Sequence, residues 1–413
     1  MLEEDFSAEI RRAGGKAYIV GGWVRDVIRG VEPRDKDYVV TGVSEVTFES
    51  LFPAAHRVGR SFPVYRLRIG GAACDVAFAR REAKSGAGYR GFDVRFDEAT
   101  TIRDDLERRD TTINSMASSL ESGALIDPFG GEGDIERRVI KATSEHFKDD
   151  PVRALRAARQ SAQFGYSIEP GTLKMMSECR SEIRGEPTER IMNELSLAIG
   201  TERPSVFFRA LLNTDLLDVT YPQLQALAGA EQDPRYHPEG DAFDHTMLVI
   251  DRAAAASDRP EVRFAALVHD IGKGLVHIGD RPHYYGHDRL GLTALEDWNR
   301  RMPLPSLWRT CAKFAIAEHM RVSRISRPGK ITDFLTRLRW HPIGIDGMSA
   351  VTLADAHRLP PFLMNAEVYC GAMDEISGND IPENLTGPER GLWLRARQCY
   401  AVARLLRHYK RRR

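Results

Sequence analysis

A glycine turn followed by two closely spaced aspartates is the part of the sequence best suited to chemistry. Residues 18–40 read as a strand, a turn at Gly21 and Gly22, a short helix and a second strand. Glycines at a helix N-terminus leave backbone N–H groups open to an anion, and the helix dipole favours it. Asp35 and Asp37 stand at the start of the second strand. Because side chains two residues apart on a strand point to one face, both carboxylates should look the same way.

This aspartate pair predicts a site for a divalent cation. Two like charges about 5 Å apart repel by roughly 3 kcal/mol at an effective dielectric constant near 20. A cation bound between Asp35 and Asp37 would remove that cost, and Mg²⁺ prefers carboxylate and phosphate oxygens. Gly21, Gly22 and Arg25 would give the phosphates a place to lie. The alternative is a glycine turn followed by a solvated acidic edge.

Length and composition limit the possible functions but do not identify one. A chain of 413 residues suggests about three structural units. Lys plus Arg equals Asp plus Glu at 59 each, so the net charge neither predicts nor excludes a nucleic-acid partner. Six of the last ten residues, RLLRHYKRRR, are Lys or Arg, which fits either RNA contact or a solvated terminal helix.

Cysteine usage and hydropathy favour a cytoplasmic protein without a membrane partner. The five cysteines are scattered and form no CxxC pair, so neither a disulfide framework nor a cysteine zinc site is indicated. No run of about 18 apolar residues occurs in the sequence, and the N-terminal segment is charged rather than apolar.

The pattern around the aspartates, GGxVRDxxxGxxxxDxD, resembles the nucleotidyltransferase core of the DNA polymerase β superfamily. In detail it resembles the class II tRNA nucleotidyltransferases, which are the CCA-adding enzymes and their relatives the bacterial poly(A) polymerases. The resemblance implies a polymerase β-like head in which Asp35 and Asp37 are catalytic and bind Mg²⁺. It also implies a third acidic position on a neighbouring strand, for which Asp75 in the hairpin predicted at 64–79 is the candidate. The alternative for Asp75 is a strand-edge residue or a structural ion pair.

Two further segments of the head resemble this family. LERRDTTINSMA, at 106–117, is similar to the second motif, RRDxTxNA. It implies a helix starting near residue 106 that aims Arg109 at the nucleotide triphosphate and Asp110 at the sugar. Residues 80–92, RREAKSGAGYRGF, are rich in glycine and charge, which predicts a mobile loop. This segment resembles the loop that helps CCA-adding enzymes switch from C to A, the alternative being a tolerated insertion.

From about residue 147 the pattern becomes helical. Pro151 suits a first helical turn, and arginines then recur every three residues along one side. FKDDPVR resembles the fourth family motif, EDxxR, in which an aspartate and an arginine pair with the Watson–Crick edge of the incoming base. The resemblance assigns this role to Asp150 and Arg153, and nucleotide contacts to Arg156 and Arg159. A fifth motif should brace this region through three structural side chains: Glu189, Arg190 and Glu194.

Histidines and aspartates recur after the polar boundary at 229–238. Both are ligand types for divalent transition metals. The arrangement resembles the HD metal-dependent phosphohydrolase superfamily, which implies Ni²⁺, Mn²⁺ or Zn²⁺ as the metal and phosphate monoesters and 2′,3′-cyclic phosphates as substrates. The implied ligands are His245, His269, Asp270 and Asp355, with His287 and His319 as weaker candidates. The alternative is a degenerate scaffold that only binds tRNA.

Together these segments predict an α+β protein of four parts. The expected parts are a polymerase β-like head at 1–145, a helical neck at 146–228 for base recognition and tRNA binding, an HD domain at 236–356 and a helical tail at 357–413. The resemblance implies template-independent addition of CCA to tRNA from CTP and ATP, by a monomer or homodimer. An enzyme adding only A or only CC, a poly(A) polymerase, an HD nucleotide hydrolase with an RNA-binding platform, and a non-catalytic tRNA-binding protein remain alternatives.

Overall fold

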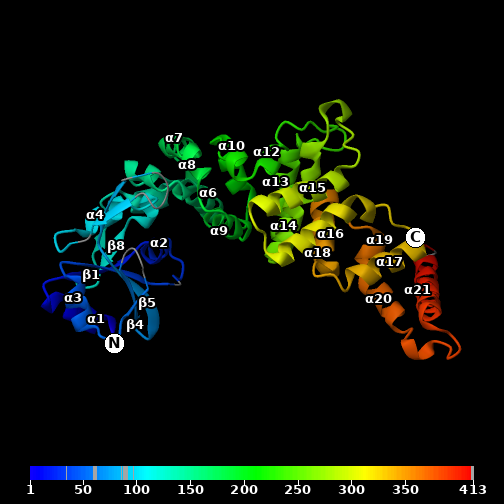
Figure 1. Ribbon diagram of the computed structural model, residues 1–413, viewed down its shortest axis with the longest axis horizontal. Helices are drawn as coiled ribbons and strands as arrows, with labels where there is room; N and C mark the ends of the chain where they lie inside the picture. The colour runs from blue at the N-terminus through cyan, green and yellow to red at the C-terminus, as the bar shows by residue number, and fades with distance from the viewer. Residues whose placement is uncertain (34, 59–62, 85, 87–91, 96, 411–413) are drawn as a thin grey trace. The chain divides into compact units, whose positions relative to one another are not determined.

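The computed structural model describes residues 1–33, 35–58, 63–84, 86, 92–95 and 97–410. The chain divides into two compact units (Figure 1). The first comprises Met1–Glu194 and Val206–Thr220, and the second comprises Leu195–Ser205 and Tyr221–Arg413. Among the helices in the described ranges, none is both long and apolar enough to cross a membrane.

A seven-stranded sheet in the order β3-β4-β5-β2-β1-β8-β9 forms the base of the first unit. Only β2 and β5 pair in parallel within it, and the other neighbours are antiparallel. Its strands are β1 (Lys16–Val20), β2 (Asp37–Thr41), β3 (His56–Arg57), β4 (Val64–Ile69), β5 (Ala72–Phe78), β8 (Ala117–Ser119) and β9 (Leu125–Ile126). The strand, turn, short helix and strand predicted at 18–40 are therefore confirmed, as is the hairpin predicted at 64–79.

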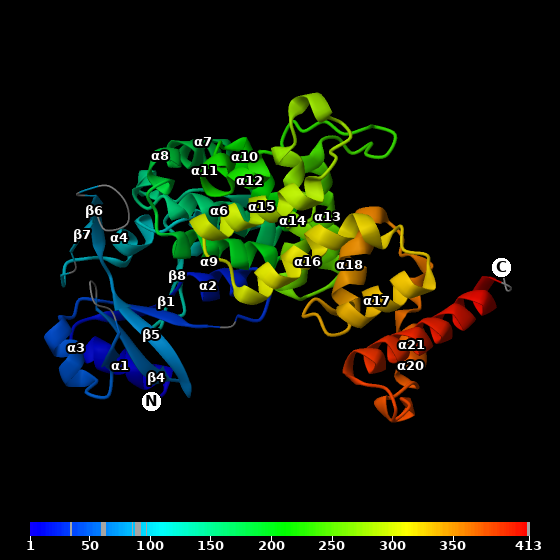
Figure 2. The same cartoon turned by 45° about the vertical axis from the view of Figure 1, so that its right-hand side comes forward.

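Tyr38, Val39 and Val40 of β2 are all buried, because helices cover both faces of the sheet. The ring of Tyr38 lies edge-on to that of Phe6, and Phe48 packs against the β5 residue Phe78, so α1 and α3 share one face (Figure 2). Val39 points to the other face and packs in a cluster with Leu106 of α4. Asp37 has the parity of Val39, which places it on the α4 side. The first helices are α1 (Glu3–Arg12), α2 (Gly22–Ile28), α3 (Glu45–Leu51), α4 (Ile102–Glu107) and α5 (Gly131–Arg137).

Two local predictions for the head were wrong. The predicted loop at 80–92 contains β6 (Arg81–Lys84) and the start of β7 (Phe92–Arg95), which pair as an antiparallel ladder. Backbone hydrogen bonds can form such a ladder without an apolar pattern; residues 85 and 87–91 lie outside the described residues. The helix expected to start near residue 106 instead ends at Glu107, since α4 already begins at Ile102 with Thr101 as its N-cap.

Helices follow the sheet, with one small exception. The described chain beyond residue 150 contains a single strand, β11 (Ser167–Ile168), which pairs with β10 (Val139–Ile140). The helices up to the second unit's main bundle are α6 (Val152–Phe164), α7 (Pro170–Glu178), α8 (Arg180–Ile183), α9 (Thr188–Ile199), α10 (Ser205–Asn213), α11 (Leu217–Thr220) and α12 (Pro222–Gln225). The predicted α+β fold class is confirmed, while the finer division into head, neck, HD domain and tail stays a prediction.

The second unit is built from helices around an aliphatic and aromatic core. Buried side chains of α13, α14, α16, α17 and α18 contribute to one continuous cluster, for example Val249, Phe334 and Val351. The helices are α13 (Ala242–Ala256), α14 (Pro260–Val268), α15 (His287–Arg301), α16 (Ser306–Val322), α17 (Pro328–Leu338), α18 (Gly344–Ala356), α19 (Pro361–Met364), α20 (Ala366–Asp374) and α21 (Gly387–Lys410). Residues 411–413 of the basic terminal run lie outside the described residues.

Candidate functional site

A cavity of about 480 Å³ in the first unit gathers all of the predicted nucleotide-binding residues. Asp37 lines it as well, together with Arg108, Asn114 and Arg190. The sequence analysis assigned no ligand contact to these last three, although the first two lie inside the RRDxTxN motif and could have been included. The predicted residues in the lining are Gly21, Gly22, Arg25, Arg109, Asp110, Asp150, Arg153, Arg156 and Arg159.

The buried carboxylate of Asp110 joins the turn after α4 to helix α6. Its Oδ1 accepts hydrogen bonds from the Thr111 backbone N–H at 2.8 Å and from Asn114 Nδ2 at 3.1 Å. Its Oδ2 accepts from Arg156 Nε at 2.8 Å and from Gln160 Nε2 at 2.9 Å. Burial opposes ionisation, but Arg156 and these donors outweigh it and hold the pKa of Asp110 well below its usual range. The contact of Asp110 with the sugar stays a prediction. The Asp110 carboxylate already accepts four hydrogen bonds from the protein.

The glycine turn brings the backbone against an arginine side chain. Gly21 has φ of +71°, and a Cβ there would lie 3.0 Å from Arg109 Nη1. Any larger residue would therefore be strained and would push Arg109 aside. Arg25, on α2, is held by Asp26 through two bonds of 2.9 Å and donates through Nη1 to Asn114 Oδ1 at 2.6 Å. The turn, α2 and the RRD segment thus form one wall of the cavity.

A second buried aspartate orients the two arginines of the RRD segment. Asp105, on α4, accepts from Arg108 Nη2 at 2.5 Å and from Arg109 Nε and Nη2 at 3.2 and 3.0 Å. Its side chain is fully buried. Burial opposes ionisation, but Arg108 and Arg109 outweigh it and lower the pKa of Asp105 to about 2. Arg109 reaches the cavity because α4 ends before it, which corrects the expectation that it lies on a helix.

The predicted base-reading pair lies at the N-terminus of α6. Asp150 Oδ1 accepts from the Val152 backbone N–H at 3.2 Å, and Oδ2 accepts from Arg190 Nη2 at 2.7 Å. Arg153 is buried and donates to the backbone carbonyl of His146. Both members of the pair are therefore fixed by protein contacts and still line the cavity. Arg190, expected only to brace the region, holds Asp150 and lines the cavity itself.

The outer arginines of α6 share one buried carboxylate. Arg159 Nε donates to Glu194 Oε2 at 2.6 Å, and Arg156 Nη1 lies 3.9 Å from Glu194 Oε1. The Glu194 side chain is only 3% exposed, so its charge depends on these partners. This contact agrees with the bracing role expected for Glu194.

Three predicted catalytic carboxylates lie at or near the N-terminal end of β2. Asp37 and Asp75 are register partners across the parallel β2–β5 pair, and Asp35 lies two residues before Asp37, the first residue of β2. Reduced solvation raises the pKa of Asp37. The positive charge of Arg109 lowers this pKa, whereas the negative charges of Asp75 and Asp35 raise it further. Asp75 also forms an exposed salt bridge of 3.1 Å with Arg66, the alternative foreseen for it. Neither Asp75 nor Asp35 lines the cavity that contains Asp37.

These carboxylates fit a hard divalent cation. Within the part of the chain that the structure describes, the Asp37 carboxylate takes part in no hydrogen bond or salt bridge. An all-oxygen donor set beside an arginine-lined cavity suits Mg²⁺ better than a transition metal. Asp35, Asp37 and Asp75 would be its ligands.

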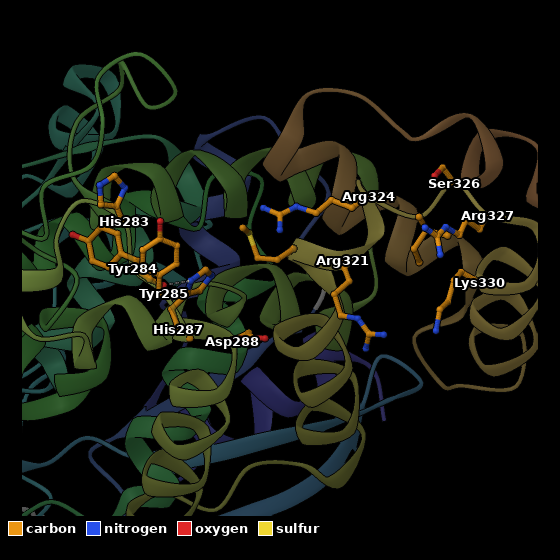
Figure 3. A pocket seen from close by; sticks show the side chains of 13 residues that line it. His283, Tyr284, Tyr285, His287, Asp288, Arg321, Arg324, Ser326, Arg327 and Lys330 are labelled. Carbon is orange, nitrogen blue, oxygen red and sulfur yellow. Dashed lines mark hydrogen bonds between the residues drawn. The ribbon is translucent and has the colours of Figure 1, made fainter.

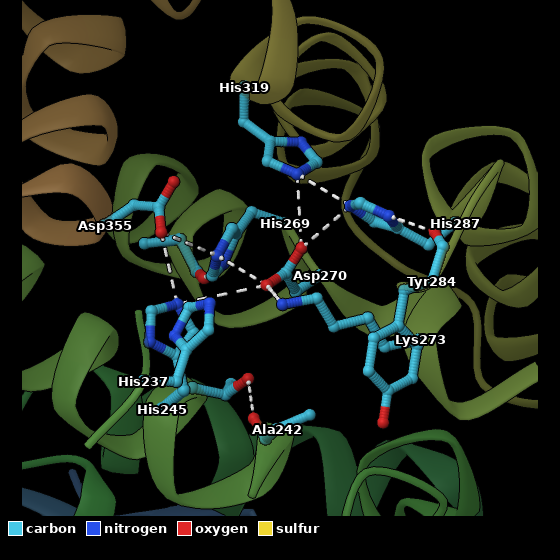
Figure 4. A network of polar contacts seen from close by, with 12 residues as sticks. His237, Ala242, His245, His269, Asp270, Lys273, Tyr284, His287, His319 and Asp355 are labelled. Carbon is cyan, nitrogen blue, oxygen red and sulfur yellow. Dashed lines mark hydrogen bonds and ion pairs between the residues drawn. The ribbon is translucent and has the colours of Figure 1, made fainter. Parts of the chain in front are cut away.

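In the second unit, the histidines and aspartates predicted as metal ligands come together in one buried cluster (Figure 4). His245 Nε2 lies 3.1 Å from Asp355 Oδ1 and 3.9 Å from Asp270 Oδ2, while its Nδ1 is 2.7 Å from Glu239 Oε1. His269 Nδ1 is 2.7 Å from the Ala266 carbonyl, which turns Nε2 toward the carboxylates. All four predicted ligands, including the distant Asp355, are thus adjacent.

Asp270 connects this set to two further histidines. Its Oδ1 lies 3.1 Å from both His287 Nε2 and His319 Nε2, and its Oδ2 is 2.6 Å from Lys273 Nζ. Both histidines are buried and lie against Asp270, so these two weaker ligand candidates belong to the same cluster. Burial opposes ionisation, but Lys273 and His269 hold the pKa of Asp270 well below its usual range.

The cluster depends on a close approach between the HD segment and α15. A Cβ at Gly272 would lie 1.9 Å from the backbone oxygen of His287, a contact that no side chain can make. Gly272 therefore permits the segment after Asp270 to pack directly on the first turn of α15. The glycine of the sequence HDIGKG thus sets the position of His287, a role the sequence analysis did not recognise.

The cluster fits a transition metal. His269 is fully buried, yet its Nε2 makes no hydrogen bond within the described part of the chain. Oxygens of Asp270 and Asp355 lie 3.4 and 3.6 Å from that nitrogen, at the distances expected around a shared ligand rather than in direct bonds. Imidazole and carboxylate donors suit Zn²⁺, Ni²⁺, Mn²⁺ or Fe²⁺. Glu239 and the Ala266 carbonyl would orient the ligating histidines.

Comparison with known proteins agrees with this arrangement of sites. Residues 17–141 match the model of the poly A polymerase head domain, residues 165–227 that of a probable RNA and SrmB-binding site of polymerase A, and residues 242–348 that of the HD domain. The multifunctional CCA protein of Methylococcus capsulatus is 37% identical over 409 residues, covering 94% of this chain and 95% of its own. That of Xylella fastidiosa is 41% identical over 318 residues, covering 76% of each chain.

This chain belongs to the multifunctional CCA protein family. The resemblance found in the sequence is therefore confirmed. The fold is also that of the Bacillus stearothermophilus CCA-adding enzyme in complex with CTP, which superposes with a TM-score of 0.65 at 22% identity over 97% of this chain and 91% of that one. For a member of this family, the arginine-lined cavity and the HD cluster are two separate chemical sites on one chain.

The Asp105 ion pairs predict an acid-sensitive head. Because the pKa of Asp105 is lowered from 3.8 to about 2, its stabilising contribution is present above about pH 4 and is lost as the pH falls toward 2. Between pH 4.5 and 3 this residue should cost about 1 kcal/mol of the free energy of unfolding. Urea denaturation of the parent and of Asp105→Asn, followed at several pH values by amide exchange in β1 and β2, measures the difference.

The variant should be less stable than the parent at pH 7, yet lose less stability on acidification. The exposed, ion-paired Glu121→Gln serves as a matched control and should keep the parental slope. Equal pH slopes for Asp105→Asn and the parent would contradict the prediction.

Proposed function

We propose that the first unit adds CCA to the 3′ end of tRNA, using CTP and ATP and no nucleic-acid template. The carrying observation is the cavity that joins seven arginines to Asp150 and Asp37, in a chain of the multifunctional CCA protein family. In each addition the terminal 3′-hydroxyl oxygen of tRNA attacks the α-phosphorus of the nucleotide. A P–O bond to pyrophosphate breaks as the new phosphodiester bond forms.

The arginines next to the glycine turn position the triphosphate. Arg109 is clamped by Asp105 through Nε and Nη2, so its Nη1 edge faces Gly21. Arg25 is fixed in the same way by Asp26 and Asn114. A guanidinium group has five N–H donors, so each retains donors for phosphate oxygens after pairing with protein. Holding the phosphates in place before reaction lowers the entropy cost of the transfer.

The reacting end of the nucleotide should lie at the carboxylates beside the N-terminal end of β2. Asp37 lies at the cavity, with Asp75 beside it on β5 and Asp35 just before β2. When bound there, Mg²⁺ would neutralise charge on the phosphates and on the leaving pyrophosphate. The raised pKa of Asp37 is consistent with a position that calls for positive charge.

Base selection rests on the pair at the start of α6. Asp150 offers an acceptor and Arg153 offers donors, which match the edges of cytosine and adenine but oppose uracil and guanine. Arg190 holds Asp150, and His146 holds Arg153, so the pair is rigid enough to serve as the template. The switch from C to A is assigned to residues 80–92, of which 85 and 87–91 lie outside those described.

We propose a second, independent activity, hydrolysis of phosphate esters at the HD cluster. The carrying observation is the buried His269 Nε2, which has no hydrogen-bond partner in the described chain and faces two carboxylates. A bound Ni²⁺, Mn²⁺ or Zn²⁺ would supply a Lewis acid for a phosphate monoester or a 2′,3′-cyclic phosphate. Water would add to phosphorus, one P–O ester bond would break, and the leaving oxygen would take the proton. Lys273 keeps Asp270 ionised and in place.

The proposed biological partners follow from these two activities. They are tRNA, CTP and ATP for the transferase and an RNA or nucleotide phosphate for the hydrolase. The proposed state is a cytoplasmic monomer or homodimer.

Sequencing of extended RNA ends tests the transferase proposal. A tRNA that ends at its discriminator base should receive C, C and A in turn from a mixture of all four nucleoside triphosphates. A run of A on tRNA that already ends in CC, without C incorporation, would show an A-adding enzyme, and products ending in CC would show a CC-adding one. Equal extension of an unstructured RNA would favour a poly(A) polymerase.

Replacement of Asp37 separates catalysis from binding. Asp37→Asn and Asp35→Asn should each lower nucleotide addition by at least a hundredfold, because the charge that would hold the cation is lost. Binding of tRNA, measured by filter retention, should change by less than threefold. Glu121→Gln is the control carboxylate of the same unit and should be fully active. Retention of more than a few per cent of the rate by either variant would count against cation-assisted transfer at this pair.

Replacement of His269 or Gly272 should remove the hydrolase and spare the transferase. His269→Ala deletes a ligand, and Gly272→Ala forces the HD segment away from α15. Both should lower hydrolysis of a 2′,3′-cyclic nucleotide by at least a hundredfold and weaken Ni²⁺ or Mn²⁺ binding in equilibrium dialysis. The exposed His277→Ala is the control. Parental hydrolysis by His269→Ala would show that the HD assignment is wrong.

A further inference from the structure

A cavity of about 560 Å³ lies beside the HD cluster in the second unit (Figure 3). One wall is the segment before α15 and its first turn; the other runs from the end of α16 to the start of α17. His287 lines the cavity and also stands 3.1 Å from Asp270 Oδ1 in the cluster. Met320, also in the lining, follows the cluster residue His319 directly. The cavity therefore adjoins the HD cluster through His287.

The far wall of the cavity is cationic. Arg321, Arg324, Arg327 and Lys330 line it, against one carboxylate, that of Asp288. Arg321 is paired with Glu318 at 3.3 Å. In the described ranges of the chain, no salt bridge engages the side chains of Arg324, Arg327 and Lys330, and all three residues are exposed. Unpaired cations of this kind suit a ligand with several phosphates.

The near wall carries an exposed aromatic platform. Tyr285 is 81% exposed, and its ring stacks on that of His283 at 5.6 Å with an angle of 23°. Tyr284 between them is buried, donating its hydroxyl to the Glu231 carbonyl at 2.6 Å. Its own carbonyl lies 2.8 Å from His287 Nδ1. These contacts fix the backbone, so Tyr285 is presented to solvent on a rigid support beside the cavity.

Figure 3 shows Tyr285 on one side of the cavity and Arg327 and Lys330 on the opposite side, with Arg324 between them. A mononucleotide has one phosphate, which the HD cluster would engage, leaving the outer cations without a ligand. An RNA strand brings further phosphates along its backbone, and each base can stack on an aromatic ring. A volume of about 560 Å³ is in the range of small-ligand pockets.

We propose that this cavity binds the 3′-terminal nucleotides of a single-stranded RNA and presents the terminal phosphate to the HD cluster. A base stacks on Tyr285, and the preceding backbone phosphates lie against Arg324, Arg327 and Lys330. This inference rests on the phosphohydrolase proposed above and makes its preferred substrate an RNA end rather than a free nucleotide.

Two substrates with the same scissile group test the proposal. One is a trinucleotide ending in a 2′,3′-cyclic phosphate, which has no free 3′-hydroxyl for the transferase to extend, and the other is the cyclic mononucleotide. The parent should prefer the trinucleotide at least tenfold in kcat/KM. Arg324→Ala with Lys330→Ala, and separately Tyr285→Ala, should bring that ratio close to one, mainly through KM. Arg300→Ala, an exposed arginine of α15 outside the cavity, is the control and should keep the parental ratio.

The salt dependence gives a second measure of the same contacts. Loss of two phosphate contacts should reduce the slope of log KM against log salt by about 1.4 for a single strand. Equal kcat/KM values for the two substrates in the parent, or an unchanged ratio in both variants, would overturn the inference.

Binding of RNA distinguishes failure of this inference from failure of the hydrolase proposal. If the parent hydrolyses neither substrate with Ni²⁺, Mn²⁺ or Zn²⁺, the hydrolase proposal fails. The anisotropy of a fluorescent trinucleotide ending in a 3′-phosphate then decides the binding question. An affinity at least fivefold weaker in the double variant than in the Arg300→Ala control would support the cavity as an RNA site, and equal affinities would overturn it.

Discussion

The buried carboxylate of Asp110 is the interaction on which the transferase site depends. It accepts bonds from the turn after α4 through Thr111 and Asn114, and from α6 through Arg156 and Gln160. A residue 6% exposed with four donors fixes the sheet-bearing part of the unit against α6, at whose N-terminus the proposed base-reading pair lies. Removing Arg156 would be destabilising, because the desolvated charge of Asp110 would lose its cationic partner. Position and stability are therefore set by the same contacts.

Asp270 has the corresponding place in the second unit. Its two oxygens meet Lys273, His287 and His319 directly, and His269 and His245 lie around the same carboxylate. Such a concentration of buried polar groups is unfavourable unless each is paired, and His269 Nε2 is the atom left without a hydrogen bond in the described chain. The Asp110 network closes on itself, whereas this one is complete only with a ligand. That difference supports the proposal of a metal at the HD cluster.

Sequence reasoning found the order of the elements and most of the site, because these depend on local pattern. The apolar run after Asp37 makes β2 a buried strand whatever surrounds it, and the RRD and HD segments carry their chemistry in adjacent residues. Two of the features that it missed depend on distant residues. Arg190 reaches the cavity only because α9 brings it within 2.7 Å of Asp150, forty positions earlier. Gly272 matters because α15 packs on it, and no feature of the local sequence shows that contact.

Although the formal net charge is zero, the chain has two cationic cavities of different kinds. In the first unit, arginines are paired with aspartates and glutamates, such as Arg109 with Asp105 and Arg159 with Glu194. Pairing orients the guanidinium groups in advance and leaves donors for the ligand, which suits discrimination between bases.

The second-unit cations are exposed, and ordering such long side chains costs up to about 2 kcal/mol each in rotamer freedom. That cost lowers affinity, but it lets the same side chains follow phosphates at varying positions. The first-unit site, proposed to discriminate between bases, therefore needs acidic partners that hold its arginines in fixed orientations. The second-unit cations, proposed to follow backbone phosphates, do not need such partners.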